Sequence, residues 1–303
     1  MCLQSARRCS ILPSLSRTTE FRLFGGLGNQ LFILAAGRYL EEHANHVVSF
    51  NTWYLKRFGD NHDASITDRG FPDTFIDKAP FMGDGNRFLS KRLSGREKAY
   101  IPDSGLGWDP QLATLRRGRS VKGYFQSWRY ADTLRNKITR LDLIRREGAS
   151  PWLSKELARA ELCQPVMVHV RRGDYRKLSS TFGLVGSDYF GSAIDYVRAS
   201  GIENEIWVFS DDIAAAAQIF SGLRIPARII EPPPGGDPGE SILLMAHGRA
   251  NIISNSTFAW WGAFLNLESE LVVAPSPWFR EISIPAELLP DTWVKLPHRF
   301  SSA

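Results

Sequence analysis

The sequence predicts an α/β protein whose second half is a parallel sheet with helices packed on both of its faces. Short apolar segments typical of strands recur in this half, and a helical segment separates each of them from the next. Strands that alternate with helices in this way pair in parallel and are joined by crossover helices. The first half also opens with this alternation, as a strand, a glycine-rich loop, a helix and a second strand. We therefore expect two α/β halves that face a cleft.

Each strand and helix is predicted from its pattern of apolar residues. In the second half we expect strands at 165–170, 205–210, 227–231, 251–255 and 271–275, and helices at 187–200, 212–223, 241–249 and 256–266. In the first half we expect strands at 21–24, 46–50 and 121–128, and helices at 31–44 and, broken near Gly148 to Pro151, at 138–162. Residues 51–120 show few clean periods and are predicted to be loops with short elements, and 231–240 (EPPPGGDPGE) a loop over the sheet edge.

The division of the chain follows from these elements. We place the boundary within residues 150–164, so that 21–155 form one domain and 156–303 the other. Residues 1–20 are rich in Arg and Ser and nearly free of acids. That composition resembles a transit peptide, but we favour a disordered tail or a start codon placed too early.

Composition limits the class of protein. With 43% hydrophobic and 23% charged residues, the 303-residue chain is typical of soluble globular proteins. The net charge of +5 is a weak indication of an anionic partner, but the basic residues lie among acids rather than in a stripe, so we expect no nucleic acid. Three scattered cysteines indicate a reducing compartment such as the cytoplasm. No apolar run approaches the roughly 20 residues of a membrane span.

The stretch VMVHVRRGDY (166–175) places charge directly after an apolar strand. His169, Arg171, Arg172 and Asp174 would lie at the carboxyl edge of the sheet, where open α/β sheets bind ligands. The arginine fork suits phosphate oxygens. The alternative is a network of ion pairs between the two halves, because buried charges must be paired.

Two further segments end at the same predicted edge. Asp211 and Asp212 follow one strand; they could cap the next helix, and one carboxylate could also accept the two N–H donors of a guanine edge. Ser256 and Thr257 begin a helix that is apolar nearly all round, and such a helix N-terminus can bind an anion. The tryptophans at 260 and 261 are predicted to be core.

The glycine-rich loop GGLGNQ (25–30) lacks the spacing of a dinucleotide fingerprint and the Lys of a phosphate-binding loop. It indicates only that backbone approaches something closely. No Asp-x-Asp pair occurs, so we expect no metal. His43 and His46 have no evident third ligand, and we interpret them as surface residues.

Five separated motifs resemble those of bacterial α-1,2-fucosyltransferases, glycosyltransferase family 11. They are FGGLGNQLF, GYFQSW, HVRRGDY, FSDD and ESILLMAHGRANIISNSTFAWWGAF, and the resemblance runs from about Phe21 to Pro275. It implies two Rossmann-like halves of GT-B type and a metal-independent, inverting enzyme that uses GDP-fucose. The acceptor it implies is a galactoside-terminated oligosaccharide or glycolipid, which would allow peripheral contact with the inner membrane.

The resemblance also implies roles for individual residues. Arg171 would grip the β-phosphate of the donor with His169 beside the nucleotide, and Asp211 or Asp212 would face guanine. Ser256, Thr257 and Phe258 would contact phosphate and base, with Arg172 in the same site.

On the acceptor side, Gly26 and Gly28 would let backbone approach the sugars and Asn29 would orient a hydroxyl or the fucose ring. Asp174 is a weak choice for the base.

Two departures are LFILAAG (31–37), where the family more often has Gln-Tyr-Ala, and Ser179, where some relatives carry a glutamate. An α-1,6 or peptide O-fucosyltransferase, or a non-catalytic GDP-binding protein, remain alternatives.

Overall fold

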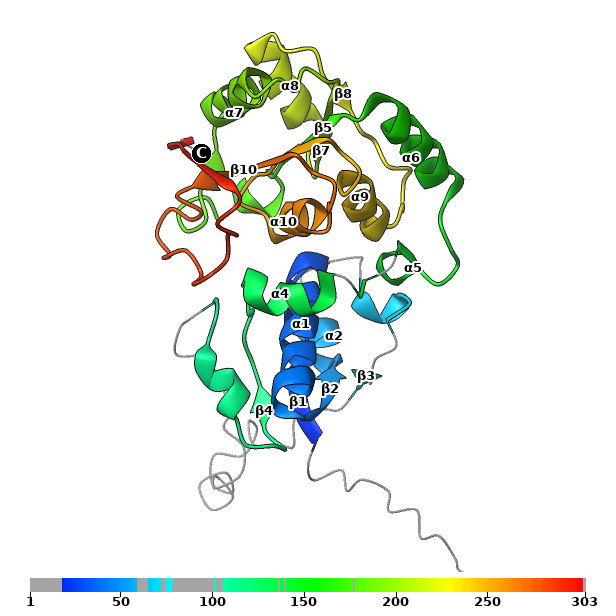
Figure 1. The fold of residues 1–303 in the computed structure, drawn as a ribbon, viewed down its shortest axis with the longest axis vertical. Coiled ribbons are helices and arrows are strands. Elements are labelled where there is room, and N and C mark those ends of the chain that lie inside the picture. The colour runs from blue at the N-terminus through cyan, green and yellow to red at the C-terminus, as the bar shows by residue number, and fades with distance from the viewer. Residues whose placement is uncertain are drawn as a thin grey trace, which may run out of the picture.

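The computed structural model describes residues 18–58, 65–71, 75–77, 101, 106–135, 137–138, 140–176 and 178–301. Two parallel sheets organise them (Figure 1). We call residues 18–135, which contain the four-stranded sheet, the first lobe. Residues 151–301, which contain the six-stranded sheet, are the second lobe. The α/β fold with parallel sheets that the sequence predicts is confirmed.

The first lobe has the strand order β3-β2-β1-β4, with every pair parallel. Its first strand begins at Thr18, three residues before the predicted start at Phe21. Residues 18–20 pair with the second strand, and Glu20 also pairs with Ser120 and donates its N–H to the carbonyl of Arg119. The elements are β1 (Thr18–Arg22), α1 (Leu27–Ala44), β2 (Val47–Asn51), α2 (Trp53–Phe58), β3 (Phe75–Ile76), β4 (Ser120–Val121) and α4 (Trp128–Arg135). Short 3₁₀ turns lie at Ile66–Asp68 and Pro110–Thr114.

The strand predicted at 121–128 is wrong beyond its first residue. β4 ends at Val121, and Phe125 has a φ of 52°, which no strand residue adopts. α4 then begins at Trp128. The aromatic residues that suggest a strand lie in a loop and at the start of a helix instead: Phe125 is buried, and Tyr124 and Trp128 are partly buried.

The second lobe has the order β11-β10-β9-β5-β7-β8, and all of these pairs are parallel. All five predicted strands are present, and β11 was not predicted. The strands are β5 (Val166–Val170), β7 (Ile206–Ser210), β8 (Arg228–Ile229), β9 (Ala250–Ile252), β10 (Leu271–Ser276) and β11 (Val294–Pro297). A separate antiparallel pair joins β6 (Leu184–Val185) and β12 (Phe300–Ser301).

The helices of the second lobe are α6 (Pro151–Cys163), α7 (Ser187–Ala199), α8 (Ile213–Leu223), α9 (Pro238–Met245) and α10 (Thr257–Phe264), and α5 (Arg140–Leu143) lies in the segment that joins the lobes. Alternate side chains of β5 serve the two faces of the sheet. Val166, Val168 and Val170 belong to a cluster with α7, while Met167 belongs to the core shared with α9, α10 and the first lobe. The tryptophans at 260 and 261 are fully buried, as expected of core residues.

The lobes meet where the first turn of α1 faces α10 (Figure 1). A Cβ on Gly28 would lie 2.6 Å from the carbonyl carbon of Thr257, so only glycine allows this approach. The indole Nε1 of Trp261 donates to the carbonyl oxygen of Gly28 at 2.9 Å. The segment between β10 and β11 also contacts the first lobe, because Trp128 N donates to the carbonyl of Glu287.

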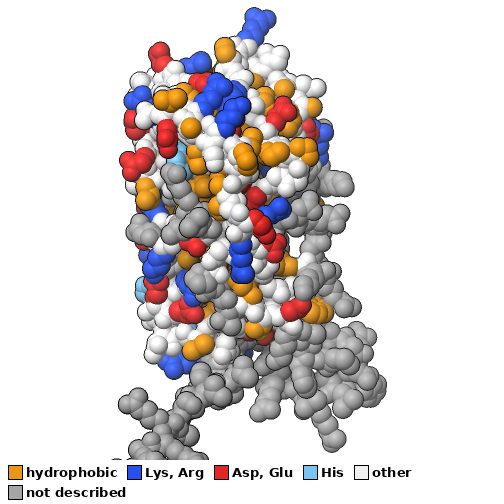
Figure 2. Space-filling model, turned by 90° about the vertical axis from the view of Figure 1, so that its right-hand side faces the viewer, with side chains coloured by type: hydrophobic (Ala, Val, Ile, Leu, Met, Phe, Trp, Pro, Cys, Tyr) orange, Lys and Arg blue, Asp and Glu red, His pale blue; other side chains and the backbone are white. Residues whose placement is uncertain are grey.

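His46 is buried rather than exposed, with Nδ1 2.8 Å from Thr19 Oγ1, whereas His43 is exposed. The predicted loop at 231–240 ends early because Asp237 caps α9. On the face in Figure 2, Lys and Arg side chains lie among Asp and Glu. No helix in the described part of the chain is long and apolar enough to cross a bilayer.

Candidate functional site

Polar segments follow three neighbouring strands of the second lobe. β5 lies between β7 and β9, and the three strands run parallel. Their carboxyl ends therefore meet at one edge of the sheet. Residues 171–176 follow β5, 211–212 follow β7, and 253–256 lead from β9 into α10. The predicted gathering of these segments at one edge is what the topology produces.

Arg171 and Asp211 form an ion pair at this edge. Arg171 Nη1 lies 2.9 Å from Asp211 Oδ2, and both side chains are partly exposed. The other carboxylate oxygen accepts the backbone N–H of Arg172 at 2.8 Å. The Arg171 guanidinium also lies over the ring of Tyr175, 5.3 Å from its centre. Asp211 thus holds both the side chain of Arg171 and the turn that follows it.

Arg172 has a different environment from its neighbour. Its guanidinium donates to the carbonyl oxygens of Val185 and Arg171, at 2.8 and 2.9 Å. The residue is buried, and burial together with nearby Arg176 lowers its pKa. These contacts tie β6 to the end of β5, so Arg172 supports the edge structurally in this conformation.

Asp212 caps α8, which is the alternative considered from the sequence. Its Oδ1 accepts the N–H of Ala215 at 2.9 Å, and its Oδ2 lies 2.6 Å from Arg176 Nη2. A carboxylate at this position also interacts favourably with the positive end of the helix dipole. Both of its oxygens are therefore engaged.

His169 is buried on β5 beside the loop from β9. Its Nδ1 lies 2.9 Å from Ser254 Oγ, and its ring is 5.9 Å from that of Phe258. Burial, and secondarily the charge of Arg171, lowers the pKa of His169 to about 3. The imidazole is therefore neutral at physiological pH.

The N-terminus of α10 lies between the lobes. Ser256 is its N-cap and is buried, but its hydroxyl makes no capping hydrogen bond. Thr257 and Phe258 are partly buried, and their backbone is packed against Gly28. The first turn of α10 is thus held by the glycine-rich loop of the first lobe.

That loop is mostly helical, because α1 begins at Leu27 and Gly26 is its N-cap. Gln30 is buried and both ends of its amide are hydrogen-bonded. Its Nε2 donates to Gly25 O in the loop, and its Oε1 accepts from Ile66 N in the 3₁₀ turn Ile66–Asp68. Asn29 is partly buried, and its Oδ1 accepts a hydrogen bond from Gln126 Nε2 at 3.0 Å. Four sequence-predicted groups, Gly28, Thr257, Phe258 and His169, are therefore in one contiguous region.

A family model described as glycosyl transferase family 11 matches residues 120–285, more than half of the chain. The chain belongs to glycosyl transferase family 11. It is a glycosyltransferase, and the matched region contains the three segments at the sheet edge.

Curated relatives agree with this assignment. The transferase is 27% identical over 300 residues to the O-antigen biosynthesis glycosyltransferase WbnK of Escherichia coli, covering 90% of this chain and 99% of the relative. It is 26% identical over 291 residues to an α-1,2-colitosyltransferase of Escherichia coli, covering 91% and 97%. It is 29% identical over 150 residues to the mouse galactoside 2-α-L-fucosyltransferase Sec1, covering 47% and 41%.

Solved structures support the fold. The NodZ α-1,6-fucosyltransferase, solved after soaking with GDP-fucose, superposes with a TM-score of 0.51 at 15% identity and covers 86% of this chain and 96% of its own. At that identity the likeness shows the fold alone. It agrees with the GT-B-type arrangement expected for the transferase.

Asp174 is the one predicted site residue whose side chain lies outside what the structure describes. Its backbone begins the 3₁₀ turn Asp174–Arg176, in which Arg176 N donates to the carbonyl of Arg172 at 3.0 Å. The suggested role of Asp174 as base remains a prediction.

Sequence reasoning missed several residues that hold the site together. Tyr175 lies under Arg171 and donates from its hydroxyl to Asn255 O at 3.0 Å. Ser254 is the partner of His169, and Gln126 is the partner of Asn29. Each falls within a motif visible in the sequence, but its contact partner is 80 or more residues away. Spacing along the chain cannot reveal such pairs.

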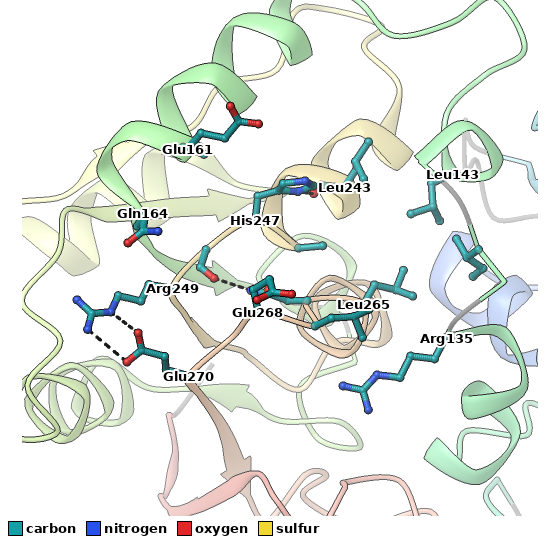
Figure 3. Close-up of a pocket in the computed structure, with 16 residues that line it drawn as sticks. Arg135, Leu143, Glu161, Gln164, Leu243, His247, Arg249, Leu265, Glu268 and Glu270 are labelled. Atoms are coloured by element: carbon teal, nitrogen blue, oxygen red, sulfur yellow. Dashed lines mark hydrogen bonds and ion pairs between the residues drawn. The ribbon is translucent and has the colours of Figure 1, made fainter.

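A cavity of about 660 Å³ lies at the opposite edge of the second sheet (Figure 3). It is lined by residues that lead into β5, β9 and β10, together with Arg135 of the first lobe. Arg249 and Glu270 pair at its margin, 2.7 Å apart. Buried Asn266 donates to Gly248 O. No predicted site residue lines this cavity, so it is separate from the site described above.

Proposed function

We propose that the transferase moves fucose from GDP-β-L-fucose to the 2-hydroxyl of a terminal β-galactoside, with inversion to the α anomer. The observation that carries the proposal is the ion pair of Arg171 with Asp211 in a family 11 chain, at the carboxyl edge of the sheet, where open α/β sheets bind ligands. The relatives named as α-1,2-colitosyltransferase and galactoside 2-α-L-fucosyltransferase support the linkage.

The chemical requirement is to stabilise GDP as it leaves with growing negative charge. The Arg171 fork can donate two hydrogen bonds to diphosphate oxygens. The open N–H groups of α10, with the Ser256 hydroxyl, can contribute further donors to the same group. Donors that are already in place stabilise such charge without reorganisation. If a bound phosphate replaced Asp211 as the partner of Arg171, Asp211 would still accept the backbone N–H of Arg172.

His169 contributes as a neutral group in this proposal. An imidazole whose pKa is about 3 cannot serve as an acid near pH 7, and its Nδ1 is occupied by Ser254. We propose that it contacts the nucleotide through shape and hydrogen bonding. The base that takes the acceptor proton would then be a carboxylate, and Asp174 is the nearest along the chain to Arg171.

Inversion in one step requires the acceptor to attack from the face opposite GDP. Arg171 belongs to the second lobe, so we propose that the first lobe receives the galactoside. Gly26 and Gly28 let backbone lie close to the sugars, and the Asn29 amide can donate to a hydroxyl or to the fucose ring. The acceptor would be an oligosaccharide or glycolipid encountered in the cytoplasm.

The reaction can be tested with GDP-fucose and lactose, with the product recorded by NMR. We expect a single α linkage at the galactose 2-hydroxyl. A β linkage, or fucose at another hydroxyl, contradicts the proposed reaction while leaving the donor in place. Release of GDP without a product would instead favour hydrolysis or simple nucleotide binding.

A second donor is favoured by one comparison. The α-1,2-colitosyltransferase relative covers 91% of this chain, whereas the mouse fucosyltransferase covers 47%. Colitose is fucose without its 3-hydroxyl, so the same linkage can be made from either GDP-sugar. Parallel assays with both donors at equal concentration decide between them. Preference for the colitosyl donor would replace fucose in the proposal and keep the 2-hydroxyl acceptor.

We also propose that no metal ion is needed, because the arginine and helix donors suffice to neutralise the leaving group. Removing divalent ions with excess EDTA should leave the rate within about twofold of that in buffer. A loss of activity that manganese or magnesium restores would show that a metal holds the diphosphate.

A further inference from the structure

The side-chain amides of Gln126 and Asn29 meet within the first lobe, close in sequence to Gly28 and Trp128, which contact the second lobe. Gln126 Nε2 donates to Asn29 Oδ1 at 3.0 Å. Gln126 is 5% exposed, and its Oε1 is buried without a partner among the described residues. A Met or Leu of similar size would fill this space without an unpaired acceptor. What Gln126 supplies that an apolar side chain lacks is therefore the donor to Asn29.

The direction of this hydrogen bond fixes which end of the Asn29 amide is presented. The two ends of an amide have nearly the same shape, so only hydrogen bonds distinguish them. If Gln126 turned over, its NH₂ group would become the unpaired buried group, and orphaned N–H groups are rarer than orphaned carbonyls. The described residues place no acceptor on Asn29 Nδ2, which lies 2.9 Å from where a Cβ on Gly25 would be. Both N–H donors of Asn29 are thus left for a ligand.

The backbone before Gln126 is in an unusual conformation that directs its side chain. Phe125 has a φ of 52°, although it carries a large side chain. Its ring is fully buried and makes edge contacts with Phe21 and Tyr130, at 5.7 and 5.8 Å between centres. These contacts hold the strained residue in place. Strain that is retained in this way is typical of residues that support a functional site.

We propose that Gln126 is a positioning residue, which orients Asn29 so that its NH₂ group donates to a sugar oxygen. The inference rests on the proposed function, because it takes Asn29 to contact the fucosyl or acceptor sugar. Gln126 itself touches no substrate. Its effect is to prevent the Asn29 amide from turning its oxygen toward the sugar.

A double-mutant cycle tests this role. We compare the unchanged chain, Q126M, N29A and the double variant, measuring kcat and KM for transfer to lactose and GDP affinity by calorimetry. We expect Q126M to lower kcat/KM by about 10- to 100-fold when Asn29 is present and by less than about threefold in the N29A chain. GDP affinity should stay within about twofold in all four proteins, because neither amide belongs to the proposed phosphate contacts.

A matched control changes a residue of the same GYFQSW motif, at the start of α4, without touching Asn29. Trp128→Phe removes the exposed hydrogen bond from Nε1 to Glu287 Oε2, 3.2 Å long, and its effect should be equally small with and without Asn29. Should Q126M fail to fold, Q126E replaces it, because glutamate keeps the size and the acceptor but not the N–H. Equal losses in both backgrounds would overturn the positioning role alone. An unchanged chain that transfers no sugar from either donor would overturn the proposed function and this role with it.

Discussion

Arg171 is held as a fork at the sheet edge by one carboxylate, and this geometry gives the first prediction. Arg171→Lys keeps the charge but cannot make two parallel hydrogen bonds. Because one positioned donor contributes about 10²–10³ in rate, we expect kcat to fall at least 100-fold. Steady-state transfer to lactose measures the loss.

Arg176→Lys is the matched control for that change. Arg176 lies five residues later and is more than half exposed, with Asp212 as its partner. We expect it to retain activity within about twofold, since exposed ion pairs contribute little. If Arg171→Lys kept half of the normal rate, Arg171 would have no part in the mechanism.

The buried His169 makes the second prediction, which concerns stability against pH. Its pKa is about 3 in the folded chain and about 6.5 when unfolded. Below pH 6.5 the unfolded chain therefore binds a proton that the folded chain does not, and stability is lost as the pH falls. Between pH 7.5 and 5.0 this one group costs about 2 kcal/mol.

His169→Gln removes that titrating group and keeps a polar partner for Ser254. We expect the drop in unfolding free energy between pH 7.5 and 5.0 to shrink by about 2 kcal/mol relative to the unchanged chain. Urea unfolding at the two pH values measures the difference. An unchanged pH dependence would mean that His169 binds its proton as readily in the folded chain as in the unfolded chain.

At this scale the sequence predicts residue types better than residue roles. Arg171, His169 and Ser256 lie at the expected edge because strand ends and helix starts are local features. Arg171 and Arg172 differ in role because their partners differ: Asp211, 40 residues away, pairs with Arg171, and Val185, 13 residues away, accepts from Arg172. Nothing in two adjacent arginines indicates which one turns inward. Asp212 was predictable as a cap because it directly precedes an apolar helix.

At the element scale, the first turns of α1 and α10 can pack closely because Gly28 has no side chain. Gly28→Ala would place its Cβ 2.6 and 2.7 Å from backbone atoms of Thr257 and Phe258, which cannot move independently. We expect the free energy of unfolding to fall by about 1–3 kcal/mol. Transfer should fall about tenfold or more, because the first turn of α10 is displaced from the donor site.

Gly222→Ala controls for the loss of a glycine. Gly222 lies in α8 with no atom within 4 Å of an added Cβ. We expect it to raise the unfolding free energy by about 0.4–1 kcal/mol and leave transfer unchanged. Urea unfolding and the lactose assay apply to both variants. A Gly28→Ala protein as stable and active as the original would show that the two helices are not in contact during turnover.

Elements of the second lobe were predictable because each strand is a short apolar run bounded by a helix of clear period. The first lobe was less so, since its outer strands β3 and β4 have two residues each and carry no pattern. β11 was missed because it is only four residues long, contains a proline and has no fully buried residue. The sheet recruits it through pairing with β10, which is a long-range contact.

At the scale of the whole molecule, one buried ion pair ties the lobes together. Arg69, 1% exposed, donates from both Nη atoms to Asp237 at the start of α9, at 2.6 and 2.9 Å. Asp237 also accepts the N–H groups of Arg145 and Gly239. Burial raises the pKa of Asp237, but the hydrogen bonds and charge of Arg69 and the two amides outweigh it, so its pKa lies below the ordinary value. The 168 residues between the partners place this contact beyond sequence patterns.

Asp237→Asn should weaken the whole protein more than any exposed substitution does, because it leaves the charge of Arg69 buried without compensation. We expect the unfolding free energy to fall by about 3–5 kcal/mol. Glu205→Gln is the matched control; it breaks the exposed pair with Arg159, whose side chains are 37% and 50% accessible, and should cost at most about 1 kcal/mol. Urea unfolding compares the two variants. If both lost the same small amount, Arg69 would reach water in solution, and the lobes would be held by their other contacts, such as the packing of α1 on α10 and the hydrogen bond from Trp128 to Glu287.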